Sequence, residues 1–362
     1  MHSKIVKEIG SEFWIDSEPS KINGAPAWLA AYGKTSLFSS GRGAITSVLQ
    51  GARDRGFERA VLPSYLCEAM IVPFERAGFK IEFHSLNASL ECDMEEIKKM
   101  CARERSILFH MGYFGFDTNL NIKKATGELE KLGTFVMEDI THTLFSDVSS
   151  SGAHCKVASL RKWMGLPSGG AVFCDDENIV RSGNIAHQKL VDIRLKALSL
   201  KGRFIENGDV LLKKEFLELF AEGEKILNND VNAYAIDPVS MSILGGVNIG
   251  EIKSKRSANY EHLFRELSCV KWIRPVFGSL PDNVCPIFFP FFCENGERDK
   301  IKAMLVAHDI YCTSHWPLYH KLNGKLTNDV THLYDDMISI PCDQRYDLQD
   351  MNRVVSVLKE YK

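Results

Sequence analysis

Residues 156–174 read KVASLRKWMGLPSGGAVFC, and this stretch decides the fold that the sequence predicts. Two short apolar runs, 156–160 and 171–174, flank a turn that contains Pro, Ser and two Gly residues. Short apolar runs bounded by turn formers are typical of buried strands. Lys162 follows the first run directly, so the sequence places a lysine where one strand of a sheet ends.

The same alternation of short apolar runs and helical patterns extends upstream to about residue 36. Strands are expected at 59–62, 80–86, 107–109 and 134–137, and helices after Gly43 and over 122–132. Strands separated by helical crossovers are typical of a parallel sheet. We therefore expect an α/β domain with a mostly parallel central sheet.

The second half of the chain changes character. Residues 176–265 are mainly helical in pattern, and the remainder is mixed, with a final helix that Asp347 caps. A chain of 362 residues is long enough for two domains. The sequence predicts an N-terminal arm (1–35), a large α/β domain (36–240) and a smaller α+β domain (241–362).

Composition excludes several classes of protein. A net charge of -3 gives no basic field that could hold a nucleic acid. No apolar run approaches ~18 residues, so no membrane span is expected. The ten cysteines include no C-x-x-C pair, which argues against a zinc ribbon and favours free thiols in a reducing compartment. We predict a cytoplasmic protein that contacts neither nucleic acid nor membrane.

A glycine-bearing loop opens the first helix of the large domain. Ser40-Gly41-Arg42-Gly43 precedes an apolar stripe at helical spacing, and a helix N-terminus favours an anion. Gly41 and Gly43 would let a phosphate approach the backbone closely. The loop taken alone fits a simple turn and N-cap equally well, and it is not a P-loop, because no Gly-Lys-Ser/Thr follows.

Two charged residues complete a pattern with this loop. Asp139 ends the apolar run 134–137, where a carboxylate needs a cationic or donating partner, either a pyridinium nitrogen or an arginine in a structural pair. A single Lys such as Lys162 is usually a solvated charge, but here it lies beside Arg161 between two strands. A Schiff-base lysine, a carboxylate and a helix N-terminus together describe a pyridoxal phosphate site.

The segments that carry this pattern resemble the DegT/DnrJ/EryC1/StrS aminotransferases, which have the aspartate aminotransferase fold (fold type I). The resemblance rests on 40–45, 62–67, 138–142, 159–170 and the closing run 340–346, which keep the order of the family along most of the chain. The segments around Asp139 and Lys162 are the specific ones.

The resemblance implies roles for individual residues. Lys162 would form the Schiff base, and Asp139 would keep the ring nitrogen protonated. His142 stands where many members have Gln, near the ring oxygen. The remaining expected residues bind phosphate or lie near the ring or substrate: Gly41, the amides of Arg42 and Gly43, the Ser159 hydroxyl, Tyr65 on the ring face, and His315 and Arg345, both of which also fit structural roles.

The activity implied by the resemblance is transfer of an amino group from an amino acid, with glutamate expected, to a keto-sugar linked to a nucleotide. Pyridoxamine phosphate would carry the amine between the two half-reactions. A homodimer is also implied, with 194–203 near the partner. Other fold type I chemistry, such as a lyase or an acyl condensation, and a non-catalytic descendant that binds the cofactor or sugar are the alternatives.

Overall fold

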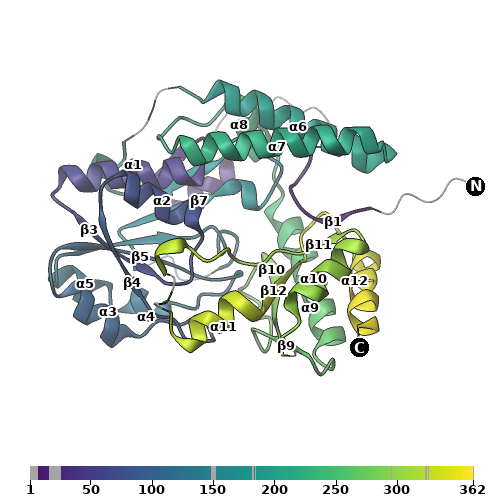
Figure 1. Ribbon diagram of the computed structural model, residues 1–362. Coiled ribbons are helices and arrows are strands. Elements are labelled where there is room, and N and C mark those ends of the chain that lie inside the picture. The colour runs from purple at the N-terminus through teal and green to yellow at the C-terminus, as the bar shows by residue number, and fades with distance from the viewer. Residues whose placement is uncertain are drawn as a thin grey trace, which may run out of the picture.

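The computed structural model describes residues 7–15, 26–147, 152–181, 183, 185–294, 296–322, 324 and 326–361. Residues 1–6 and 16–25 of the predicted arm lie outside this set. Figure 1 shows a large sheet enclosed by helices beside a smaller lobe that contains both described ends of the chain.

A seven-stranded sheet forms the centre of the large lobe, in the order β2-β8-β7-β6-β5-β3-β4. Neighbouring strands from β4 to β7 run parallel, and β8 runs antiparallel to both β7 and β2. This confirms the predicted α/β class with a mostly parallel sheet. The strands are β2 (Thr35–Phe38), β3 (Arg59–Pro63), β4 (Lys80–His84), β5 (Ser106–Met111), β6 (Thr134–Asp139), β7 (Cys155–Ser159) and β8 (Gly170–Phe173).

Helices cover both faces of this sheet because both faces of its inner strands are apolar. On one face, Val61, Leu108 and Val136 pack against α3 (Met94–Cys101), α4 (Leu120–Lys124) and α5 (Thr126–Lys131). The alternate residues of the same strands face α1 (Gly41–Asp54) and α2 (Glu68–Arg76). The two layers lie above and below the sheet in Figure 1.

One predicted helix is divided in two. The pattern over 122–132 predicts a single helix, whereas α4 ends at Lys124 and α5 begins at Thr126. The Thr126 hydroxyl bonds to the carbonyls of Ile122, Lys123 and Gly152. A threonine hydroxyl that bonds to nearby carbonyls competes with the regular helical pattern.

The small lobe contains a three-stranded antiparallel sheet in the order β12-β10-β9. The chain reaches it through the long helical pair α6 (Gln188–Asn207) and α7 (Val210–Asn229) and then α8 (Pro238–Gly245). The predicted boundary at residue 240 falls within α8. The other elements are β9 (Ile273–Pro275), β10 (Phe288–Cys293), β12 (Met337–Pro341), α9 (Ile249–Leu267), α10 (Arg298–Ala307), α11 (Asn328–Asp336) and α12 (Leu348–Glu360).

Residues 7–15 of the predicted arm belong to the small lobe. Their strand β1 (Ile9–Gly10) pairs in parallel with β11 (Ile310–Tyr311). The next residues cross toward the large lobe, where Lys201 of α6 donates to the Ser11 hydroxyl at 2.7 Å. The arm therefore ties the two lobes together beside the carboxyl ends of the central strands.

Candidate active site

The site is built where β6 and β7 end side by side. Asp139, the last residue of β6, lies opposite Val157 of β7 in the parallel register. Successive side chains of a strand point to opposite faces, so Asp139 faces the α1 and α2 layer and Glu138 faces the other layer. The short 3-10 helix η2 (Leu160–Lys162) follows β7 directly and brings Lys162 to the same edge of the sheet.

Asp139 is a buried carboxyl group without a cationic partner. Its Oδ1 accepts a hydrogen bond from the Thr141 amide at 2.7 Å, and no Lys, Arg or His pairs with it among the described residues. Burial raises the pKa of Asp139 to about 6, although its hydrogen bonds with Thr141 act in the opposite direction. A cation placed against this carboxylate would be strongly favoured.

Thr141 connects this carboxylate to the lysine segment. Its hydroxyl accepts the Ser159 amide at 2.8 Å, and its carbonyl accepts the indole N–H of Trp163 at 2.7 Å. Three bonds from one residue therefore fix the end of β6 against the segment that carries Lys162. Thr141 was not among the predicted site residues, although it lies two residues after Asp139, where a backbone amide can donate to the Asp side chain.

Lys162 stands in the wall of a cavity of about 370 Å³ between the two lobes. The sequence suggests apolar surroundings, but the side chain is exposed to this cavity, because η2 turns it out of the sheet. Among the described residues, no hydrogen bond or ion pair engages its ammonium group. The positive charge of Lys162 reaches several buried groups, and it contributes to the lowered pKa values of His142 and His315.

The glycine loop (residues 40–43) contacts Ser159, which begins the segment that carries Lys162. This contact is expected if both segments bind one anion. Ser40 caps α1, as one of the two predicted serines, by accepting the Gly43 amide at 3.0 Å. The amides of Gly41 and Arg42 have no acceptor within the described ranges. A Cβ on Gly41 would lie 2.9 Å from the Ser159 Cβ, so only glycine allows the loop and the serine to approach this closely.

The Arg42 side chain points away from this loop toward α7. It donates to Asn228 at 2.8 Å and lies 3.5 Å from Glu224. Glu224 also pairs with Arg161 at 2.9 Å. The guanidinium group of Arg42 is thus engaged in the structure, whereas its backbone amide is free.

Two histidines are buried beside Lys162. His142 accepts the Phe114 amide at Nδ1 (3.2 Å), which assigns its proton to Nε2 and leaves a neutral donor. Burial, with a further contribution from Lys162, lowers the pKa of His142 to about 3. His315 lies with its ring 5.8 Å from that of His142 and bonds to the Ser339 hydroxyl at 3.0 Å. The structure therefore brings the two predicted histidines together.

Tyr65 is fully buried and is not among the residues that line the cavity beside Lys162. Its hydroxyl donates to the His315 carbonyl, and its ring contacts Trp316, whose own ring lies 5.8 Å from that of His142. Two residues further along, burial raises the pKa of the Cys67 thiol, and the charge of Lys162 acts in the opposite direction. The sequence gives no signal for Trp316, because it lies about 150 residues from the lysine.

Arg345 lines the same cavity as Lys162, but its donors are already used. Its Nε and Nη2 form a bidentate pair with Asp343, with both distances 2.8 Å. Its Nη1 donates to the Glu12 carbonyl at 2.9 Å. This geometry favours the structural role that the sequence left open, in which Arg345 holds the arm over the cavity.

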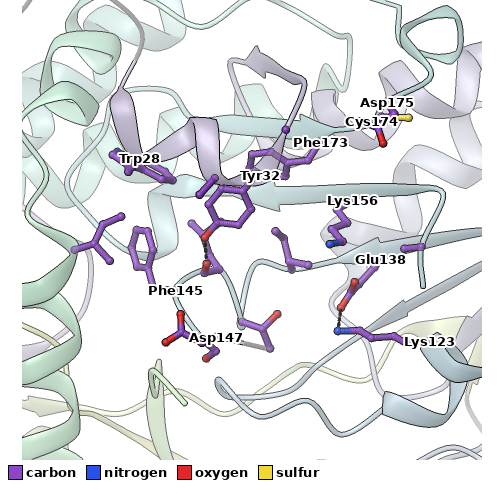
Figure 2. Close-up of a pocket in the computed structure, with 18 of the residues that line it drawn as sticks. Trp28, Tyr32, Lys123, Glu138, Phe145, Asp147, Lys156, Phe173, Cys174 and Asp175 are labelled. Carbon is purple, nitrogen blue, oxygen red and sulfur yellow. Dashed lines mark hydrogen bonds and ion pairs between the residues drawn. The ribbon is translucent and has the colours of Figure 1, made fainter. Parts of the chain in front are cut away.

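A larger cavity of about 600 Å³ lies on the opposite face of the sheet. Figure 2 shows its aromatic end, with Trp28, Tyr32, Phe145 and Phe173, and its charged end, where Lys123 pairs with Glu138 at 2.8 Å. Lys253 at its margin pairs with Asp147 at 2.7 Å. Because Glu138 faces away from Asp139, this larger cavity is separate from the site around Lys162.

The described part of the chain shows no metal-ligand cluster, no disulfide and no membrane-spanning helix. It contains no group of three or more His, Cys, Asp or Glu side chains that could hold a metal ion. All ten cysteines are free thiols, and six of them are buried. Among the described residues, no helix has the length and apolar character needed to cross a bilayer.

Comparison with known proteins finds similarity in fold but not in sequence. No protein-family model matches the sequence, and no curated protein matches it. Solved structures do match over nearly the full length, and they share the large mixed sheet and small C-terminal sheet of fold type I aminotransferases. The fold of this chain is that of the fold type I aminotransferase structures.

The structures that match across nearly the full length include sugar aminotransferases of the DegT/DnrJ/EryC1/StrS type. Helicobacter pylori PseC, an aminotransferase of pseudoaminic acid biosynthesis, matches with a TM-score of 0.71 and 15% identity over 98% of this chain and 99% of PseC. A DegT/DnrJ/EryC1/StrS aminotransferase from Brucella abortus matches at 0.65 and 16% over 92% and 88%. DesI, crystallised with its TDP-sugar product, matches at 0.65 and 13% over 97% and 93%.

Proposed function

We propose that this protein is a pyridoxal phosphate-dependent aminotransferase with Lys162 as its Schiff-base residue. The observation that carries the proposal is the buried, unpaired carboxyl group of Asp139, which Thr141 and Ser159 link to the lysine segment. An uncompensated buried carboxylate is costly unless a ligand supplies the cation. The protonated nitrogen of the pyridine ring is such a cation.

The described residues fit this cofactor at both of its ends. The free amides of Gly41 and Arg42 at the N-terminus of α1, with the Ser159 hydroxyl beside Gly41, form a site for the phosphate. Since Ser40 takes the Gly43 amide, we assign the phosphate to Gly41 and Arg42 rather than to Arg42 and Gly43. Bound there, pyridoxal phosphate supplies an electron-withdrawing ring for the reacting carbon.

Three side chains of the protein, Lys162, Asp139 and His142, would hold or transfer the protons of the reaction. Lys162 Nζ, free of other partners in the described ranges, would take the proton from the substrate carbon and return it in the second half-reaction. Asp139 would hold the proton on the ring nitrogen. His142 Nε2–H, the donor left over when Nδ1 accepts from Phe114, would bond to the ring oxygen.

For substrates, we propose an amino-acid donor, with glutamate first, and a nucleotide-linked keto-sugar as acceptor. The pathway of PseC and the TDP-sugar product of DesI support a sugar substrate, because both structures share this fold over nearly their whole length. A cytoplasmic homodimer is part of the same proposal. Lys201, which was expected near a partner, is fully buried in its own chain, where it bonds to Ser11 and Glu12.

The test is the absorption spectrum of the purified protein with added pyridoxal phosphate. Wild-type protein should show a visible band that borohydride removes, and mass spectrometry should then find the reduced adduct on Lys162. Lys162→Ala should lack both signals, whereas Lys189→Ala, at an exposed position of α6, should keep them. Absence of the band from wild-type protein would refute the proposal.

Glutamate separates the transaminase from its fold type I alternatives. Addition of glutamate alone should bleach the visible band and release 2-oxoglutarate in an amount stoichiometric with the protein. A lyase or an acyl-condensing enzyme would not release a stoichiometric keto acid in the absence of a second substrate. A band that glutamate and other common amino acids leave unchanged would therefore count against the aminotransferase proposal.

A further inference from the structure

Two cysteines lie at the open end of the antiparallel pair β7–β8. Cys155 is the first residue of β7, and Cys174 directly follows the last residue of β8. Both residues are buried, with 1% and 6% of their surfaces exposed, and both are free thiols. Neither belongs to the proposed site around Lys162, at the other end of β7, so the cofactor chemistry makes no use of them.

The strand register places the two cysteines opposite each other. Lys156 of β7 lies opposite Phe173 of β8, so one further step along the antiparallel pair brings Cys155 opposite Cys174. The Cys174 amide donates to the Lys34 carbonyl at 3.1 Å, on the β2 side, and therefore points away from β7. Opposite residues that exchange no backbone hydrogen bonds have Cα atoms about 4.5 Å apart, and their side chains share one face of the sheet.

The contacts of the side chains agree with this register. The Cys174 Sγ donates to the carbonyl of His154, the residue before Cys155, at 3.3 Å. A hydrogen bond between the two thiols raises the pKa of Cys155, as burial also does, and lowers the pKa of Cys174 against the effect of burial. The thiolate is therefore favoured on Cys174 and the proton on Cys155.

This arrangement meets the requirements for reversible thiol oxidation. Bridged cysteines usually have Cα atoms about 4.4–6.8 Å apart, which includes the separation expected from the register. Redox-sensitive thiols combine a lowered pKa with a second thiol that can resolve the oxidised sulfur. Cys174 is also among the residues that line the cavity of about 600 Å³, where Figure 2 shows it beside Asp175, so a small oxidant has a route to this residue.

We propose that Cys155 and Cys174 form a redox-active dithiol that hydrogen peroxide converts to a reversible disulfide. The Cys174 thiolate attacks one peroxide oxygen, the O–O bond breaks, and the leaving hydroxide takes a proton to become water. Cys155 Sγ then attacks the resulting sulfenic sulfur, the S–O bond breaks, and hydroxide leaves with the Cys155 proton as a second water. The two thiols lose two electrons in total, and the peroxide gains them.

The disulfide would have two consequences for the protein. It would close a loop of residues 156–173, which contains Ser159 and Lys162, and so restrain the two strands that flank the lysine segment. It would also hold Cys174 at an oxidation level that small thiols can reverse, because sulfinic and sulfonic acids form only when no thiol resolves the sulfenic acid.

The sequence allows this disulfide to be identified directly. Trypsin cleaves after Lys and Arg, so Cys155 lies in the peptide 132–156 and Cys174 in the peptide 163–181, and neither peptide contains another cysteine. The folded, full-length protein is treated with hydrogen peroxide, blocked with N-ethylmaleimide and digested without reductant. Mass spectrometry should find the two peptides joined, with the mass of two hydrogen atoms lost, and dithiothreitol should separate them.

Matched variants test the role of each thiol. Cys269→Ser, which removes an exposed thiol elsewhere, should form the linked peptides like wild type. Cys155→Ser should form no link, and its Cys174 should proceed to the sulfinic acid at a peroxide concentration that gives the disulfide in wild type. Cys174→Ser should leave Cys155 reduced, with circular dichroism to establish that both variants fold.

Three outcomes would overturn the proposal. The first is folded wild-type protein that yields no linked peptides after peroxide treatment, and the second is a link from either cysteine to a different one. The third is a Cys155–Cys174 link that forms only in urea, because the folded hairpin would then not direct it. The measurement needs neither pyridoxal phosphate nor a substrate, so its result is independent of the proposed aminotransferase activity.

Discussion

Replacing Asp139 by Asn should stabilise the cofactor-free protein, although it removes a residue of the proposed site. The carboxyl group is fully buried, and burial raises its pKa from 3.8 to about 6, against the opposing effect of its hydrogen bonds with Thr141. Each pKa unit corresponds to about 1.4 kcal/mol. Ionised Asp139 therefore costs about 3 kcal/mol of folding free energy at pH 7.5.

The sign follows from proton linkage. Because the folded pKa is above the unfolded one, the folded state binds more protons between about pH 4 and pH 6, and stability falls as pH rises through this window. The amide introduced by Asp139→Asn would not titrate, and its side-chain oxygen could still accept the Thr141 amide. The advantage of the variant over wild type should be about 3 kcal/mol at pH 7.5 and about half of that at pH 5.

Urea unfolding followed by circular dichroism at the two pH values measures this difference. Added pyridoxal phosphate should reverse the order at pH 7.5, because the ring nitrogen gives the wild-type carboxylate its missing cation. Thr134→Ala, also buried on β6 but with no charge to lose, is the control for substitution within the strand. An Asp139→Asn protein that is less stable than wild type at pH 7.5, without cofactor, would refute the reasoning.

Three further predictions test the surrounding geometry. Gly41→Ala should destabilise the protein by about 1–3 kcal/mol in urea unfolding and weaken cofactor binding, because its Cβ would lie 2.9 Å from that of Ser159; unchanged values would show that the two segments can separate. Burial lowers the pKa of His142 to about 3, so its ring NMR signals should not titrate between pH 5 and 8; a transition there would contradict the neutral-donor assignment. Arg345→Gln should release the arm and speed limited proteolysis within 7–15, whereas a cleavage rate like that of wild type would argue against the anchoring role.

The sequence predicts the parts of the fold that depend on local pattern. The apolar runs that form β3, β5 and β6, the cap at Ser40 and the positions of Asp139 and Lys162 at strand ends all follow from residues close together in the chain. Alternation of strands and helices then fixes the parallel sheet, because parallel strands need crossover connections. The carboxyl ends of such strands meet at one edge of the sheet. Asp139 and Lys162, which stand at the ends of two of these strands, could therefore be expected near each other.

Features that depend on distant segments could not be predicted in this way. The pairing of β1 with β11 joins residues about 300 positions apart, and it helps to bring Glu12 and Phe13 to the cavity. The hydrogen bonds of Arg256 could not be predicted, because its acceptors include the carbonyls of Pro286 and Ile287, about 30 residues along the chain. Single-residue register is equally difficult, so the assignment of Tyr65 to the ring face stays a prediction.

The unpaired carboxylate of Asp139 links a cost in stability to the proposed function. Asp139 is buried, and no Lys, Arg or His among the described residues pairs with it. A buried carboxylate without a cation destabilises the fold. A cofactor with a protonated ring would supply that cation beside the segment that carries Lys162. Binding of the cofactor should therefore stabilise the fold, and the gain in stability should increase with the cofactor concentration.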